Sequence, residues 1–126
     1  MPSSKRKSAG TSSRVLRGKA FEKAAEQLLT KQGFEIVERN WRTGHKEIDL
    51  IVRRGNLLVF VEVKSSRSTK FGHPAERVDK RKIKYLTEAA EIYIEKVKIT
   101  GCDLRFDVVT FINGVPEHYP DAFGVE

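Results

Sequence analysis

The chain has 126 residues, a length that suits one domain with its own hydrophobic core. No apolar run approaches the ~20 residues of a membrane-spanning helix, and the single cysteine, Cys102, excludes an intrachain disulfide and a zinc site built from paired cysteines. The N-terminus is polar and lacks the apolar stretch of a secretory signal, so we expect a cytoplasmic protein that does not associate with membranes.

The net charge of +7 is concentrated in two parts of the chain. The first 19 residues hold six basic residues and no acidic one, and the segment from Lys64 to Lys84 holds eight basic residues against two acidic ones. This uneven distribution favours a polyanionic partner such as nucleic acid. A basic tail or a solvated helix face has the same composition, so charge alone leaves both interpretations open.

The first half of the chain reads as a tail, a helix and three strands. Residues 1–13 are rich in Ser, Lys and Gly, which predicts a disordered basic tail ahead of a folded domain at 14–126. Apolar pairs at helical spacing predict a helix over 14–32, and Gly33 stops it. Strands are then predicted at 34–42, 46–53 and 57–65, the last two joined by a turn at Gly55-Asn56.

The second half repeats the order of helix and strand. Gly and Pro predict a loop over 66–76, followed by a long helix over 77–98. The inner stripe of this helix consists of Val78, Lys82/Ile83, Leu86, Ala89/Ala90, Tyr93 and Val97. A strand is predicted at 104–112, and the segment after the Asn113-Gly114 turn adds a short last strand. The expected fold is therefore α/β, with a mixed β-sheet flanked by helices.

Two acidic residues lie inside the apolar strands of the predicted hairpin. A two-residue turn at Gly55-Asn56 pairs residues whose numbers add up to 111. One face then pairs Val52 with Val59, Leu50 with Val61 and Ile48 with Val63, and this apolar face must belong to the core. The opposite face pairs Ile51 with Phe60, Asp49 with Glu62 and Glu47 with Lys64.

The facing carboxylates of Asp49 and Glu62 would have Cβ atoms ~4.5–5.5 Å apart. Like charges in such positions repel, and a divalent cation between them would remove the repulsion. The alternative is the solvated face of a half-exposed sheet, on which Glu47 and Lys64 form a surface ion pair. The apolar residues on both sides of the two acids favour a site over this alternative.

Asp49 followed by Glu62-Val63-Lys64 matches the D…(D/E)-x-K pattern of the restriction-endonuclease-like, PD-(D/E)XK, superfamily of nucleases. Over residues 14–123 the chain also resembles the YraN-like family, small bacterial proteins predicted to be endonucleases and related in fold to archaeal Holliday junction resolvases. The segments that carry this resemblance are GKAFEKAAEQLLTKQGFEIVERNWR, EIDLI, LVFVEVKSS, FGHPAERVDKRKIKYLTEAAEIYI, RFDVV and DAF. The resemblance implies a restriction-endonuclease-like sheet.

The resemblance also implies roles for individual residues. Asp49, Glu62 and the carbonyl of Val63 would bind Mg²⁺ or Mn²⁺, and Lys64 would orient the attacking water or stabilise developing negative charge. Glu22 on the first helix would complete the metal shell or hold a metal-bound water. These residues are complemented by Glu47, which is expected to position the ammonium of Lys64, and by Gly18, whose place one turn before Glu22 suggests that something packs or binds closely there.

One departure from the family pattern precedes the Asp49 strand. Many members have Gly-Glu-Ile-Asp, whereas here His45-Lys46 precede Glu47, which alters the approach to the site and leaves the acids and Lys64 in place.

Other polar and aromatic residues receive weaker assignments. Contacts with the phosphate backbone are expected from Arg67, Lys70, Lys80, Arg81, Lys82 and Lys84. His45, His73 and His118 are scattered, are expected in loops and receive no catalytic role. Trp41, Phe71 and Tyr85 are candidates for stacking on bases, but roles in the core or as loop anchors are favoured for all three. Asp107 is expected either to support the site or to cap the edge of a strand, and it is not assigned a catalytic role.

Two classes of function remain after this reading. The first is a divalent-metal-dependent DNA endonuclease that acts on branched, single-stranded or otherwise structured DNA; cleavage of a four-way junction would require a homodimer. The second is a non-catalytic nucleic-acid-binding module with the same fold. The intact set of Asp49, Glu62 and Lys64 favours the first, because a pure binder gains nothing from two carboxylates that face phosphate.

Overall fold

The computed structural model describes residues 13–67 and 80–123, with side chains from Gly18 onward. Ser13 is already the first residue of a helix, and the rest of the expected basic tail lies outside the described residues. The same holds for the expected phosphate contact at Lys70 and for the assignments of Phe71, His73 and Val78.

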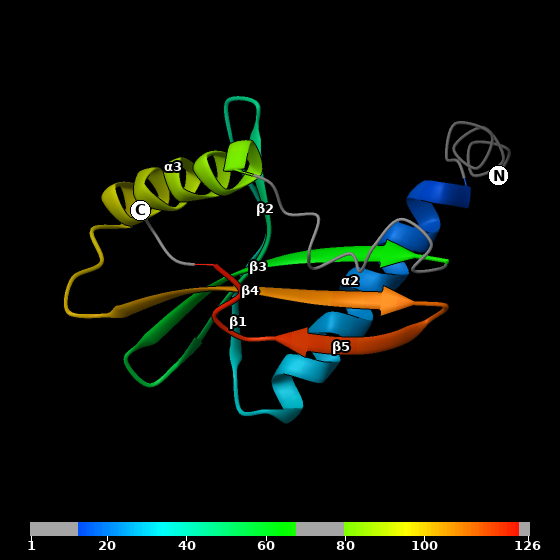
Figure 1. Cartoon of the computed structure of the whole chain (residues 1–126). Helices are drawn as coiled ribbons and strands as arrows, with labels where there is room; N and C mark the ends of the chain where they lie inside the picture. The colour runs from blue at the N-terminus through cyan, green and yellow to red at the C-terminus, as the bar shows by residue number, and fades with distance from the viewer. Residues whose placement is uncertain (1–12, 68–79, 124–126) are drawn as a thin grey trace, which may run out of the picture.

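The described residues form two helices and a five-stranded mixed sheet (Figure 1). In chain order the elements are α2 (Ser13–Lys31), β1 (Glu35–Thr43), β2 (Lys46–Arg54), β3 (Leu57–Ser66), α3 (Lys80–Val97), β4 (Asp103–Ile112) and β5 (Val115–Tyr119). The strands lie in the order β1-β2-β3-β4-β5, with β3 and β4 parallel and the other neighbours antiparallel. The predicted fold class and order of elements, including the short last strand, are confirmed.

Helix α2 ends where the sequence predicts. Gly33 has a φ of 92°, a left-handed conformation that glycine adopts without steric cost. The N–H of Gly33 donates to the carbonyl of Thr30 at 3.0 Å, and the N–H of Phe34 donates to that of Leu29 at 3.1 Å. This pattern is a Schellman motif, and it delivers Phe34 into the core beside Leu29.

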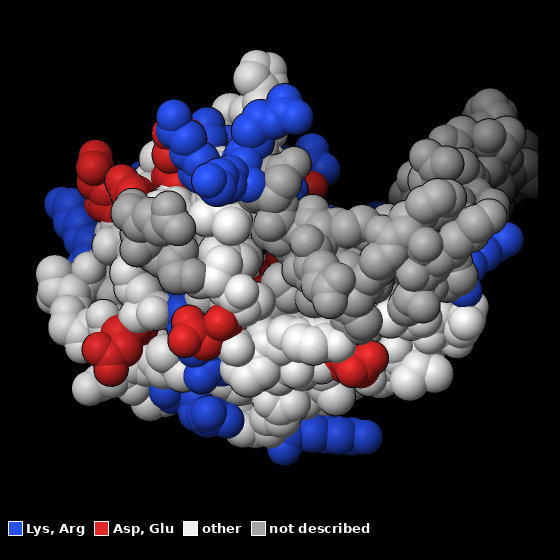
Figure 2. Space-filling view, viewed as in Figure 1, with Lys and Arg blue, Asp and Glu red and all other residues white. Residues whose placement is uncertain are grey.

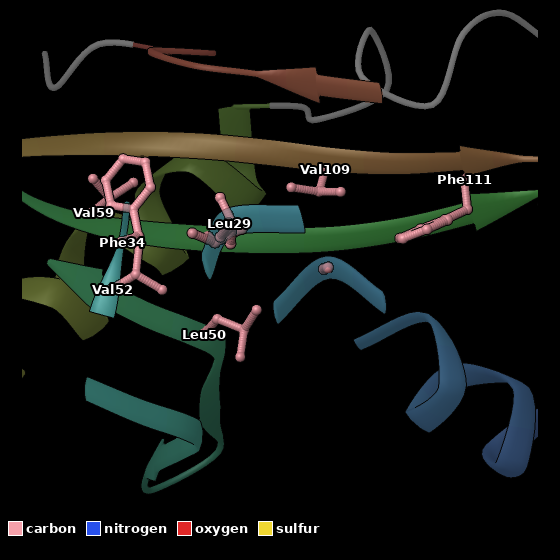
Figure 3. Close-up of a cluster of buried hydrophobic side chains, with 9 residues drawn as sticks. Leu29, Phe34, Leu50, Val52, Val59, Val109 and Phe111 are labelled. Atoms are coloured by element: carbon pink, nitrogen blue, oxygen red, sulfur yellow. The ribbon is translucent and has the colours of Figure 1, made fainter. Parts of the chain in front are cut away.

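Each face of the sheet carries its own hydrophobic core. The first core lies under α2, where Ala25 and Leu29 pack on Leu50, Val59 and neighbouring strand residues; Figure 3 shows Leu29 among the labelled side chains of this cluster. The second core lies under α3. It is built around Leu86, Ala89, Ala90, Tyr93, Ile51, Leu58, Phe60 and Phe106. Four members of the predicted α3 stripe are thus buried, whereas Val97, at the end of the helix, is 43% exposed.

The β2–β3 register agrees with the predicted turn only for the first half of the hairpin. The pairs run from Arg54↔Leu57 to Leu50↔Val61 and end there, while β3 stays paired with β4 as far as Ser66↔Ile112. Figure 1 shows the far end of β2 turning away from β3 toward α3. The predicted pairs of Asp49 with Glu62 and Glu47 with Lys64 are therefore absent from the ladder.

A kink in the β1–β2 hairpin accompanies this divergence. Asn40 on β1 has a φ of 49°, and the pairing passes from Arg39↔Leu50 to Trp41↔Ile48 across it. Alternation of side chains is interrupted at this point. Ile48 consequently packs in the second core rather than in the first, where a regular strand would place it.

Neither described helix combines the length and the apolar character needed to cross a lipid bilayer.

Candidate metal and nucleic-acid site

Asp49 lies at the point where β2 leaves β3. Its Oδ2 accepts a hydrogen bond of 2.8 Å from the N–H of Val63, so the side chain takes over a bond that a neighbouring strand would otherwise supply. Within one strand residue the N–H and the carbonyl point toward the same neighbour. The carbonyl of Val63 therefore also points into the opening between the two strands, as the sequence reading requires for a ligand.

Glu62 precedes Val63 on β3, and it is buried. Its Oε2 lies 3.3 Å from Nζ of Lys82, which α3 brings over the sheet. The same Nζ lies 4.5 Å from the centre of the Tyr85 ring. Lys82, expected from the sequence to contact phosphate, is in this structure the counter-ion of an expected metal ligand.

The electrostatics of Asp49 distinguish it from a surface carboxylate. Its burial raises its pKa from 3.8 to about 7, and the nearby charges of Glu62, Glu22 and Glu47 raise it as well, against the bond from the Val63 N–H. In the absence of a cation, Asp49 is therefore partly protonated at neutral pH. A divalent ion beside Asp49 and Glu62 would favour the ionised form of both.

Glu22 lies near this pair but is held by another partner. Its Oε1 accepts a hydrogen bond of 3.1 Å from Nδ2 of Asn40, the residue at the kink of β1. Nowhere in residues 13–67 and 80–123 do three Asp, Glu, His or Cys side chains come together as a metal-binding group. Within the described residues Glu22 therefore does not join Asp49 and Glu62 as a third direct ligand, and its other expected role, holding a metal-bound water, stays a prediction.

A smaller donor set still fits a hard divalent ion. Mg²⁺ is commonly bound by one or two carboxylates, with water and substrate phosphate at its other positions. Asp49, Glu62 and the Val63 carbonyl provide only oxygen donors. Burial and then repulsion from Glu62 raise the pKa of Asp49, and a bound cation would offset both effects.

Glu47 does not face Lys64, because β2 has left β3 before this position. The Oε2 of Glu47 instead accepts a bond of 3.1 Å from Nε of Arg42. Its N–H donates to the hydroxyl of Tyr85 at 2.6 Å, and that hydroxyl donates to the carbonyl of His45 at 3.2 Å. Tyr85 thus anchors the tip of the hairpin to α3, in agreement with its expected role, while Glu47 does not hold the Lys64 ammonium.

Lys64 is half-buried on β3, two residues after Glu62 and on the same face of the sheet. It is aligned with Thr110 of β4. Thr110 is fully buried, and its hydroxyl has no hydrogen-bond partner in the described part of the chain. The sequence reading did not single out Thr110, because an isolated Thr in a strand carries no signal of its own.

The described basic residues near this site differ in exposure. Arg67, Lys80, Arg81 and Lys84 are exposed, whereas Lys82 is half-buried. Figure 2 shows Lys and Arg side chains gathered above the start of α3 and the tip of the β1–β2 hairpin. The structure thus places an exposed basic surface next to the buried acids.

Gly18 lies in open space. Among the residues that the structure describes, a Cβ atom on Gly18 would meet no atom within 4 Å, so none of them packs against it as the sequence allowed. The glycine instead borders a hollow on the α2 side of the hairpin. This hollow is lined by Gly18, Lys19, Glu22, Asn40, Arg42 and Glu47.

A second buried carboxylate, Asp107, belongs to a different cluster. Asp107 accepts bonds of 2.8 and 2.9 Å from Nε and Nη2 of Arg105, is joined to Nε2 of His118 at 2.7 Å, and accepts the N–H of Asp121 at 2.9 Å. His118 Nδ1 also lies 3.0 Å from Oε1 of Gln32. His118 is therefore a strand residue within a polar network, and its expected place in a loop is wrong.

The surroundings of Asp107 identify it as structural. Burial alone would raise its pKa, but hydrogen bonds from His118, Arg105 and the Asp121 N–H outweigh burial and hold the pKa below its usual range. The cluster joins β4 to β5, to the chain after β5 and to the end of α2. Since its members are up to 89 residues apart, the sequence offered no local pattern by which to find it.

The fold and the site together define an α/β domain in which two neighbouring acids, Asp49 and Glu62, lie where β2 leaves β3, with Lys64 two residues further along β3. A family model described as "Uncharacterised protein family UPF0102" matches residues 21–111, and the chain belongs to this family. This match confirms the resemblance to the YraN-like family. The match includes Glu22, Asp49, Glu62 and Lys64.

Bacterial relatives match over most of their length. A UPF0102 protein of Hahella chejuensis is 47% identical over 109 residues, which cover 84% of this chain and 88% of the relative. A UPF0102 protein of Chloroherpeton thalassium is 42% identical over 115 residues, covering 86% and 89%. One from Caldicellulosiruptor saccharolyticus is 44% identical over 92 residues, covering 73% and 78%.

Proposed function

We propose that this protein is a divalent-metal-dependent DNA endonuclease that hydrolyses phosphodiester bonds with Mg²⁺ or Mn²⁺. The observation that carries the proposal is the half-buried Asp49 beside buried Glu62, where β2 leaves β3 and Lys64 follows on the same face. A pKa of Asp49 raised to about 7 is a cost that a purely structural carboxylate would avoid.

Asp49, Glu62 and the carbonyl of Val63 hold the ion through oxygen atoms. When bound, the ion supplies Lewis-acid stabilisation of the charge on the scissile phosphate. Lys64 places its ammonium on the Glu62 face, where it orients the attacking water and stabilises the charge that develops on the phosphate oxygens. Glu22, held by Asn40, adds negative charge near Asp49 without direct ligation.

The exposed residues Arg67, Lys80, Arg81 and Lys84 would contact the phosphate backbone. Such contacts provide affinity and orientation but no sequence readout. The substrate is therefore DNA chosen by structure, such as a branch or a single-stranded segment, in the cytoplasm. Cleavage of a four-way junction would require two sites, and hence a homodimer of this chain.

The test is cleavage of labelled linear, flapped, single-stranded and four-way DNAs in EDTA, Mg²⁺ or Mn²⁺. The parent protein should cleave at least one of these DNAs only when metal is present. Asp49→Asn, Glu62→Gln and Lys64→Ala should each lower the single-turnover rate by ~10²-fold or more, the effect of removing one preorganised charge stabiliser. Lys64→Ala should retain most of its DNA affinity. Absence of cleavage of every DNA under every condition would refute the endonuclease proposal.

A second candidate is a nucleic-acid-binding module without catalysis. The ion pair of Glu62 with Lys82 favours it, because this pair gives Glu62 a counter-ion without any metal. A binder should have the same DNA affinity in EDTA and in Ca²⁺, and should leave DNA intact in Mn²⁺. The two candidates are distinguished by measuring cleavage of the same DNAs and, separately, their affinity by fluorescence anisotropy.

A further inference from the structure

The ion pair between Glu62 and Lys82 occupies the position where the proposed metal needs a ligand. Nζ of Lys82 lies 3.3 Å from Oε2 of Glu62, and the two side chains are 35% and 9% exposed respectively. The single positive charge of the ammonium thus neutralises Glu62, which is the role proposed for the divalent ion. If Glu62 ligated a metal ion, the nearby Lys82 ammonium would repel that ion.

The helix that carries Lys82 is held in place by its neighbours, so the ammonium can change partner while the backbone stays where it is. It lies on the inner face of α3, one turn before Tyr85 and Leu86. Leu86 is buried in the second core, and the Tyr85 hydroxyl is tied to the backbone of the β1–β2 hairpin. A change of partner for Lys82 therefore requires side-chain rotation only.

The alternative partner for this ammonium is a phosphate of the substrate. Lys82 is next in sequence to the exposed residues Lys80, Arg81 and Lys84, and its own side chain is 35% exposed. A DNA phosphate at this surface would attract the ammonium away from Glu62. A lysine suits such an exchange, since its ammonium is a compact charge on a flexible stem.

We propose that Lys82 is a positioning residue that acts through Glu62 and makes the binding of metal and DNA mutually favourable. This inference rests on the proposed function. Without DNA, Lys82 neutralises Glu62 and weakens metal binding. With DNA, the ammonium moves to phosphate and leaves Glu62 to the metal. By linkage, the metal must strengthen DNA binding by the same factor.

The first test is Mn²⁺ affinity without DNA, measured by calorimetry on the full chain. Lys82→Met should bind Mn²⁺ at least ~5-fold more tightly than the parent, the effect of removing one unit charge at ~4 Å from a cation in a solvated site. Lys96→Met is the matched control. It removes the same charge from an exposed position at the other end of α3, about 20 Å further along the helix, and its Mn²⁺ affinity should stay within 2-fold of the parent.

The second test is DNA affinity in EDTA and in Ca²⁺, which supports binding in place of Mn²⁺. The parent should bind DNA more tightly in Ca²⁺, and Lys82→Met should lose most of this gain. Lys82→Arg keeps the charge and should retain part of the gain. A merely structural Lys82 would leave the ratio of the two affinities unchanged, and such a result would overturn the inference.

Thermal unfolding guards against a variant that folds poorly. Lys82→Met leaves buried Glu62 without its ammonium, so Mn²⁺ should raise the melting temperature of this variant more than that of the parent. If the parent and Glu62→Gln bind Mn²⁺ equally, the metal site and the proposed function fail. If Glu62→Gln abolishes Mn²⁺ binding but Lys82→Met does not tighten it, only the role of Lys82 is overturned.

Discussion

Asp49 and Asp107 are both aspartates within strands of one sheet, yet their surroundings are opposite. Asp107 is fully buried and receives hydrogen bonds from a guanidinium, a histidine and a backbone N–H, which hold its pKa low. Asp49 accepts one backbone N–H and has three neighbouring carboxylates, so burial and then repulsion from these carboxylates raise its pKa to about 7. Where counter-charges are supplied by the fold, the carboxylate stabilises the fold. Where they are missing, the carboxylate resists ionisation, which is the condition that the proposed cation site requires.

The largest effect is expected at Asp107. Asp107→Asn removes the charge shared by Arg105 and His118 and presents an amide N–H₂ to groups that are themselves donors. Loss of one partner from a buried charged pair costs about 3–5 kcal/mol, so the free energy of unfolding should fall by about 3 kcal/mol in urea denaturation. Glu26→Gln is the control, because its ion pair with Arg39 is at the surface. A loss below about 1 kcal/mol at Asp107 would show that the network is not stabilising.

Asp49→Asn should raise the free energy of unfolding, whereas Asp107→Asn should lower it. Asparagine keeps an oxygen for the Val63 N–H and removes the charge that Glu62, Glu22 and Glu47 repel. The raised pKa corresponds to about 1.4 kcal/mol for each unit, and loss of the charged hydrogen bond offsets part of this. At pH 8 in EDTA the variant should be more stable by about 2 kcal/mol and should no longer bind Mn²⁺. Lower stability would mean that Asp49 has a counter-charge after all.

The two aspartates should also respond to pH in opposite directions. Folded Asp49 binds more protons than unfolded Asp49 between pH ~4 and ~7, so its contribution to stability falls as pH rises through this window. The gain from Asp49→Asn should therefore disappear by pH ~4, and Mn²⁺ affinity of the parent should rise from pH 6 to pH 8. Calorimetry across this range would contradict the pKa assignment if Mn²⁺ affinity stayed constant.

Asp107 follows the reverse rule. Its folded pKa is lowered, so its stabilising effect is complete above the unfolded value near 4 and is lost as pH falls through the folded pKa. The difference in unfolding free energy between the parent and Asp107→Asn should thus shrink only below pH ~4.

The sequence predicted the features that depend on local pattern and missed those that depend on how strands and helices pack. Alternation and the Gly55-Asn56 turn predicted the β2–β3 pairs as far as Leu50↔Val61, because local pattern and pairing agree there. Beyond this point the left-handed Asn40 kinks the hairpin, and no period-2 reading could have moved Ile48 to the other core. The acids of the site were found because charges inside an apolar strand are conspicuous.

The partners of those acids could not be found in the same way. Lys82 lies 20 residues after Glu62, on an element whose placement depends on packing of the second core. The bond from the Val63 N–H to Asp49 exists because β2 leaves β3, which is a property of the sheet rather than of either strand.

Thr110 gives the smallest and most local test of the comparison, because it shares β4 with Asp107 but lies on the Lys64 side. Its buried hydroxyl has no partner among the residues that the structure describes. Such a hydroxyl costs about 1–3 kcal/mol when it is left unpaired, and valine has nearly the same shape without it. Thr110→Val should therefore be about 1 kcal/mol more stable than the parent in urea denaturation.

Thr110→Ser provides the control for this prediction. Serine keeps the hydroxyl and loses a buried methyl group, so its stability should fall by about 1 kcal/mol. If valine instead lowers stability and serine matches the parent, the hydroxyl has a partner on this side of β4. Polar groups without a partner or counter-charge would then be confined to the opening between β2 and β3, and β4 beside Lys64 would have none.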